Sequence, residues 1–130
     1  MTPPLVTTPA YAAVLALFFV FLSVRTIMLR GKHRIALETG SSEDLLRATR
    51  AHANCAEYLP IGLILFAFWE LRFAPAPLLH ATCMIFLAGR VLHALGISRQ
   101  PEPRLLRALG MVGTFTAINI AIAGLILSYL

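Results

Sequence analysis

Charged residues are scarce in this chain of 130 residues. Only 13% of them are Asp, Glu, Lys or Arg, whereas soluble domains carry about 25%. Apolar residues make up 58% and the mean hydropathy is +0.79, which excludes a disordered chain, a coiled coil and a nucleic-acid-binding module. The shortage of charge therefore argues against a soluble protein, and the length suits one domain covering residues 1–130.

Three stretches lack charge altogether, namely residues 10–24, 73–89 and 108–130. A hydrocarbon core about 30 Å thick takes about 20 helical residues, so each stretch predicts a transmembrane helix. A fourth apolar run, 58–69, is shorter but continues backwards to residue 51 without a helix breaker. The sequence predicts an all-α integral membrane protein, a four-helix bundle with helices over about 9–31, 42–73, 77–98 and 103–129.

Residues typical of helix starts support these bounds. Pro9, Pro77 and Pro103 stand where three of the helices should begin. Residues 40–44 read as a glycine break, a serine cap and an acidic first turn. A helix over 42–73 would be about 48 Å long, which exceeds the bilayer core, so its first turns should stand in water.

Basic residues predict the orientation. Ten of the 11 Lys and Arg residues flank the first or the third connection: Arg25, Arg30, Lys32, Arg34, Arg47, Arg50, Arg90, Arg99, Arg104 and Arg107. Only Arg72 lies on the other side. The positive-inside rule then puts both basic connections in the cytoplasm and both termini on the non-cytoplasmic side. No positive charge precedes the first apolar run and no small-residue cleavage pattern follows it, so a cleaved signal peptide is not expected.

The predicted second helix carries a polar stripe into the membrane. Arg47, Arg50, Asn54 and Glu57 follow spacings of three and four and so share one face, with Tyr58 beside them. Such groups cost several kcal/mol in a bilayer unless each finds a partner. We therefore expect the stripe to point into the bundle or toward a neighbouring subunit.

Further basic groups should lie at a similar depth. Arg90 and His93 share a face of the third helix, and Arg104 and Arg107 share a face of the fourth. Because basic groups outnumber Glu57, a carboxylate-bearing anion is a better ligand than a metal or a cation. Arginine suits a carboxylate because its planar fork donates two parallel hydrogen bonds.

A structural role for these residues is the alternative. Arg90 and Glu57 would then form an interhelical ion pair, while other basic side chains, Arg25, Arg99 and Arg107, would only reach the lipid headgroups. Trp69 is expected as an aromatic anchor at the outer membrane interface.

Two His-x-x-Cys pairs, at 52–55 and 80–83, have the spacing of metal ligands. Their cysteines should lie about 18 Å apart in depth, at about 1.5 Å per residue. That separation argues against a shared metal site and against an intrachain disulfide. We therefore predict no metal and two inert cysteines.

Two segments resemble the MAPEG family, the membrane-associated proteins of eicosanoid and glutathione metabolism. Residues 50–60 fit the pattern R-A-x-x-N-x-x-E-Y-x-P, and residues 89–96 read GRVLHALG. The similarity spans about 30–129 and looks like that of a short bacterial member, which implies the inner (cell) membrane. It also implies a homotrimer that binds glutathione between adjacent subunits at the cytoplasmic side.

The resemblance implies roles for nine residues. Seven positions would contact glutathione: Arg50, His52, Asn54, Glu57, Tyr58, Arg90 and His93. Arg104 matches an arginine that stabilises the glutathione thiolate, and Arg30 is the second choice for that role. Ile97 and Gly31 depart from the leukotriene-forming relative, in which these positions are a tyrosine and an arginine, so leukotriene synthesis is not expected.

The leading hypothesis is a glutathione transferase, with a possible peroxidase activity, that acts on hydrophobic electrophiles arriving through the lipid. Glutathione would be its co-substrate, and no metal would be needed. One alternative is a membrane protein that binds lipid or glutathione without turnover. Another is a small proton-coupled multidrug transporter that uses Glu57, although the strong charge bias and the nearby arginines argue against it.

Overall fold

The computed structural model describes residues 5–130, which form four α-helices. They are α1 (Thr7–His33), α2 (Glu43–Leu71), α3 (Ala76–Ser98) and α4 (Arg104–Leu127), and their bounds lie within two residues of those predicted. Each helix is long and apolar enough to cross a membrane. The predicted all-α, four-helix membrane architecture is therefore confirmed.

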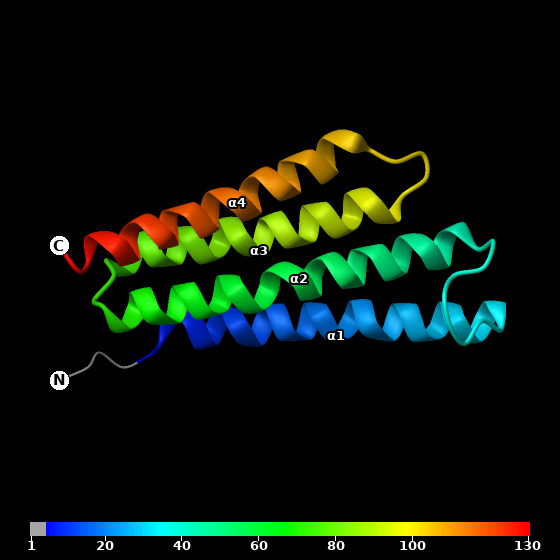
Figure 1. Ribbon diagram of the computed structural model, residues 1–130, viewed down its shortest axis with the longest axis horizontal. Helices are drawn as coiled ribbons and strands as arrows, with labels where there is room; N and C mark the ends of the chain where they lie inside the picture. The colour runs from blue at the N-terminus through cyan, green and yellow to red at the C-terminus, as the bar shows by residue number, and fades with distance from the viewer. Residues whose placement is uncertain (1–4) are drawn as a thin grey trace.

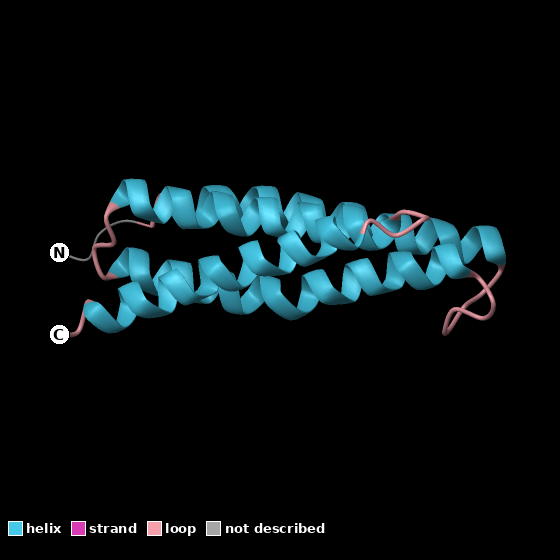
Figure 2. Ribbon diagram, turned by 90° about the horizontal axis from the view of Figure 1, so that it is seen from above, coloured by secondary structure: helices cyan, strands magenta, loops and turns pink. Residues whose placement is uncertain are grey.

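The helices run alternately up and down along one long axis (Figure 1). The loops 34–42 and 99–103 lie at one end of the bundle, here called the basic end, and Leu130 lies at the other (Figures 1 and 2). α1 packs against α2 and α3, while α4 packs mainly against α3 and also contacts α2. The basic residues that flank the first and third connections therefore gather at one end of the molecule.

The N-termini of α1 and α2 are capped in two different ways. The Ser42 hydroxyl accepts the backbone N–H of Leu45 at 3.3 Å, so the predicted serine cap is present, but one residue after Ser41, which would cap a helix that begins at residue 42. Val6 precedes α1 and offers no side-chain acceptor. In its place the Glu70 carboxylate of α2 accepts three backbone N–H groups, those of residues 6, 7 and 8, at 2.9, 2.7 and 2.8 Å.

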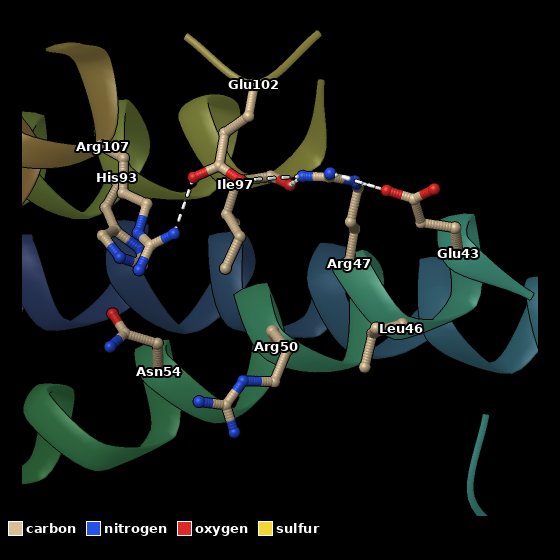
Figure 3. Close-up of a pocket in the computed structure, with 9 residues that line it drawn as sticks. All are labelled: Glu43, Leu46, Arg47, Arg50, Asn54, His93, Ile97, Glu102 and Arg107. Atoms are coloured by element: carbon tan, nitrogen blue, oxygen red, sulfur yellow. Dashed lines mark hydrogen bonds and ion pairs between the residues drawn. The ribbon is translucent and has the colours of Figure 1, made fainter. Parts of the chain in front are cut away.

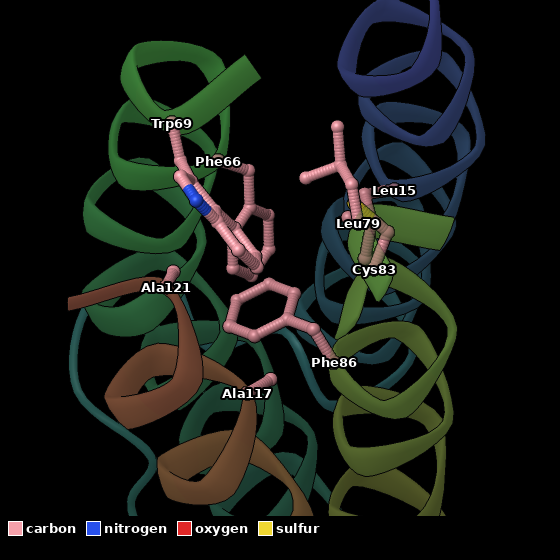
Figure 4. Close-up of a cluster of buried hydrophobic side chains, with 8 residues drawn as sticks. All are labelled: Leu15, Phe66, Trp69, Leu79, Cys83, Phe86, Ala117 and Ala121. Atoms are coloured by element: carbon pink, nitrogen blue, oxygen red, sulfur yellow. The ribbon is translucent and has the colours of Figure 1, made fainter. Parts of the chain in front are cut away.

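A hydrophobic core lies in the half of the bundle away from the basic end (Figure 4). Its centre is an edge-to-face pair, Phe66 and Phe86, whose ring centroids are 5.2 Å apart. Trp69 belongs to this core and is 3% exposed, so its predicted role as an anchor that faces the membrane interface is wrong. The indole lies against the backbone of Gly124, where an added Cβ would come within 2.3 Å of it.

α3 and α4 approach closely at glycines, because small residues let helix backbones come together in a membrane. A Cβ at Gly110 would lie 2.4 Å from the backbone nitrogen of His93. A Cβ at Gly89 would lie 2.8 Å from the carbonyl oxygen of Gly110. This contact holds the basic side chains of α3 and α4 close together near the basic end.

Candidate functional site

The polar stripe of α2 divides between the inside and the outside of the protomer. Arg47 and Asn54 are half-buried against the other helices. Arg50 and Glu57 are exposed, and within residues 5–130 no hydrogen bond or ion pair involves either side chain. Glu57 thus faces away from its own bundle, whereas Arg50 is exposed at the edge of the space described next.

A cleft of about 270 Å³ opens between α2, α3 and the start of α4 (Figure 3). We call it the basic-end cleft. Its lining combines basic, acidic, amide and apolar groups: Glu43, Leu46, Arg47, Arg50, Asn54, His93, Ile97, Glu102 and Arg107. Three of the predicted glutathione contacts, Arg50, Asn54 and His93, therefore lie around one space.

Glu102 bridges two arginines along one side of this cleft (Figure 3). Its carboxylate accepts hydrogen bonds from Arg107 at 2.6 Å and from Arg47 at 3.1 Å. These two hydrogen bonds, the one from Arg107 first, hold the pKa of the Glu102 carboxyl below its usual value. Arg47 also pairs with Glu43 at 2.7 Å. The lining thus carries three arginines against two carboxylates, a net charge of +1 before His93 is counted.

Arg90 lies beneath the cleft and is 2% exposed. Its Nη1 donates to the side-chain oxygen of Asn54 at 2.7 Å, and its Nε donates to the hydroxyl of Thr114 at 2.9 Å. The guanidinium carbon lies 5.2 Å from the centroid of the Tyr58 ring. Arg90 therefore joins α2, α3 and α4, and the alternative of an Arg90–Glu57 ion pair is wrong.

Besides Glu57, Tyr58 and Arg90, three further predicted site residues lie outside the lining of the cleft. His52 stacks on Phe19 of α1, with ring centroids 4.7 Å apart. Arg30 donates to the backbone oxygens of Ala36 and Glu38 at 3.2 and 2.8 Å, and so holds the loop 34–42. Arg104 lines a neighbouring hollow that shares Glu102 and Arg107 with the basic-end cleft. Arg104 is exposed, and it is the residue of these three that lies nearest the cleft lining.

Sequence reasoning missed the part that Glu102 plays in the cleft. The pattern Pro101-Glu102-Pro103 marks a short loop, but nothing in it indicates that the carboxylate reaches Arg47 on another helix. Arg25 does more than reach the lipid headgroups, because it donates to Ser98 of α3 at 2.6 Å. Cys55 and Cys83 are buried and free. Among residues 5–130, no three His, Cys, Asp or Glu side chains gather closely enough to hold a metal ion.

Known proteins resemble this chain over most of its length. The "Inner membrane protein YecN" of Escherichia coli strain K12 is 35% identical over 86 residues, which is 66% of this chain and 66% of the relative. The protein of the same name from Escherichia coli O6:H1 matches to the same extent. The aligned part thus spans slightly less than two thirds of these relatives. The model of the MAPEG family matches residues 8–127. The match includes all four helices almost entirely, and the chain therefore belongs to the MAPEG family.

Proposed function

We propose that the protein is a membrane-bound glutathione transferase that conjugates hydrophobic electrophiles. The observation that carries the proposal is the basic-end cleft, in which arginines outnumber carboxylates and an asparagine amide lies among them. Glutathione carries two carboxylates, one ammonium group and several carbonyl groups, so arginine and amide donors suit it. Inner-membrane location with this end in the cytoplasm belongs to the same proposal and is supported by the charge bias.

The size of the cleft favours a site completed by a second copy. Ordinary ligand pockets occupy about 300–1,000 Å³, and this cleft of 270 Å³ falls just short of that range. Glu57 points out of the protomer about 21 Å along α2 from Glu43, at about 1.5 Å per residue. An ionised group near the bilayer centre costs about 3 kcal/mol when it faces lipid. A neighbouring subunit in a homotrimer would cover both Glu57 and Arg50, and would bring the carboxylate of Glu57 into a site that Arg50 already lines.

Within such a site Arg104 would hold the sulfur as a thiolate. A free thiol has a pKa of about 8.5, so it is mostly protonated at neutral pH, and a fixed cation lowers that value. Lowering it to about 6.5 takes about 2.7 kcal/mol of preferential interaction with the thiolate. Arg104 suits this role because it is exposed beside the cleft and, among residues 5–130, no carboxylate pairs with it.

The reaction would follow from this charge arrangement. With an aryl halide, the thiolate sulfur attacks the carbon that carries the halogen and forms a C–S bond. The C–halogen bond then breaks and halide leaves with its electron pair, while the thiol proton passes to water. An apolar electrophile would reach the sulfur from the lipid, because the helices expose mainly apolar side chains below the basic end.

Conjugation of glutathione to an aryl halide by the detergent-purified protein tests the proposal. Arg104→Ala should lower kcat by about tenfold or more with a smaller change in KM, since a tenfold change in rate corresponds to about 1.4 kcal/mol. Arg99→Ala is the matched control, because Arg99 is also exposed at the basic end but lies outside the lining of the cleft and the hollow.

The outcomes separate the alternatives. A protein that neither binds glutathione nor conjugates it contradicts the proposal. Binding without conjugation indicates a non-enzymatic binding protein. Electrogenic uptake of cationic drugs into proteoliposomes, lost in Glu57→Gln, would revive the transporter hypothesis.

A further inference from the structure

Arg90 is a buried cation that pairs with no carboxylate among residues 5–130. Its hydrogen bonds go to the side-chain and backbone oxygens of Asn54, the hydroxyl of Thr114 and the sulfur of Met111. None of these groups is negatively charged, and Arg90 as a whole is 2% exposed. A buried guanidinium normally pairs with a carboxylate. Its neutral partners here indicate that the protein uses Arg90 for something other than charge pairing.

The contact with Arg90 determines which atom of the Asn54 amide faces it. A guanidinium has five N–H donors and no acceptor. The Asn54 atom 2.7 Å from Nη1 must therefore be the oxygen. The amide nitrogen, with its two N–H donors, lies on the other branch of the side chain. Among residues 5–130, that nitrogen has no hydrogen-bond partner.

Asn54 also lines the basic-end cleft (Figure 3). We propose that Arg90 is a positioning residue that holds the oxygen of Asn54, so that Asn54 offers the cleft a hydrogen-bond donor and selects a carboxylate or carbonyl group of the ligand. The inference rests on the proposed function, because the ligand considered is glutathione. To the proposed function it adds that Asn54 donates, and does not accept, a hydrogen bond in the cleft, and that Arg90 determines this orientation.

The surroundings of Arg90 make this arrangement rigid. Its Nε donates to Thr114, whose hydroxyl donates in turn to the backbone oxygen of Gly110 at 2.8 Å. The Tyr58 ring lies on α2 one turn beyond Asn54, with its centroid 5.2 Å from the guanidinium carbon. The guanidinium is thus held from α2 and α4 at once, and rotation of the Asn54 amide would place its NH₂ group against another donor.

Asn54→Asp separates a donor role from a structural role. Aspartate has the same shape and keeps an oxygen for Arg90, so the protein should keep its thermal stability or gain some. The cleft would receive a carboxylate oxygen in place of N–H donors, and glutathione affinity should fall about tenfold or more, measured by isothermal titration calorimetry. Asn54→Leu, which removes both functions, should lose stability as well as affinity. An Asn54→Asp protein that binds glutathione as tightly as the wild type contradicts the inference.

The orientation of the amide is tested without any ligand. The chain has two asparagines, Asn54 and Asn119, and each gives one pair of side-chain amide signals in ¹⁵N spectra. Arg90→Lys should shift the Asn54 pair and leave the pair of Asn119, which bonds to its own helix at Phe115, in place. An unchanged Asn54 pair contradicts the inference. Wild-type protein that fails to bind glutathione contradicts the proposed function instead, and the amide signals then decide the inference alone.

Discussion

At the scale of single residues, Glu70 replaces the cap that the start of α1 lacks. Its carboxylate accepts three consecutive backbone N–H groups, and these are among the donors that a helix start leaves without partners. The same contact ties α1 to the end of α2. A carboxylate is also favoured at this place by the positive end of the helix dipole.

Glu70→Gln should therefore lower the free energy of unfolding by about 1–3 kcal/mol, because one oxygen acceptor becomes an N–H₂ donor and the charge is lost. Thermal unfolding in detergent measures the effect. Glu38→Gln is the matched control, since Glu38 is exposed and its side chain makes no hydrogen bond among residues 5–130. Equal unfolding temperatures for the two variants would contradict this account of Glu70.

The residues in and around the basic-end cleft show how much of the site could be predicted from the sequence. The spacing of Arg50, Asn54 and Glu57 predicted a polar stripe on one face, but it did not indicate that the stripe divides, with Asn54 and Arg50 lining a cleft and Glu57 facing outward. The Arg90–Asn54 contact was out of reach, because it depends on how α3 is rotated against α2. Trp69 was placed wrongly for a related reason: position along a helix gives depth in the membrane but not the direction of the side chain.

At the scale of helices, the contact of α3 with α4 depends on small residues. Gly110→Ala should lower the free energy of unfolding by about 1–3 kcal/mol, because its Cβ would lie 2.4 Å from the backbone nitrogen of His93. In Gly31→Ala the new Cβ meets nothing within 4 Å, so that variant should be as stable as the wild type or gain up to about 1 kcal/mol from helix propensity. Chemical or thermal unfolding of both variants checks the contrast, which fails if Gly110→Ala is as stable as Gly31→Ala.

The link between α2 and α4 through Glu102 should depend on pH. Its folded-state pKa is lowered by hydrogen bonds from Arg107 and Arg47. The stabilisation is therefore present above the unfolded-state pKa and is lost as the pH falls through the lowered folded-state value. Glu102→Gln should unfold at a lower temperature than the wild type near neutral pH, and the difference should shrink in acid. A difference that stays constant as the carboxyl becomes protonated would contradict the role of the Glu102 charge.

Helix bounds were the most predictable feature of the fold. Proline at helix starts and the serine cap at Ser42 are local signals, and the observed helices follow them closely. The neighbours of each helix were not predictable in the same way, because an apolar side chain suits lipid as well as a protein core. α1 illustrates this, since its exposed and buried faces are similarly apolar.

At the scale of the whole molecule, the proposed assembly follows from charges that one protomer leaves uncovered. Detergent-solubilised protein should have the mass of three chains of 14.2 kDa each, measured by native mass spectrometry. Glu57→Gln should weaken glutathione binding and leave this mass unchanged, because the variant keeps the shape of the side chain. A monomer that binds one glutathione with full affinity would contradict a site shared between subunits.

The central claim is that this membrane protein holds glutathione at its basic end and lowers the pKa of the bound thiol. The most direct test is the ultraviolet absorbance of the thiolate, followed against pH for glutathione bound to the purified protein. The account predicts a midpoint well below the usual thiol value of about 8.5 and a return toward that value in Arg104→Ala. A midpoint equal to that of free glutathione, or no bound glutathione at all, would contradict it.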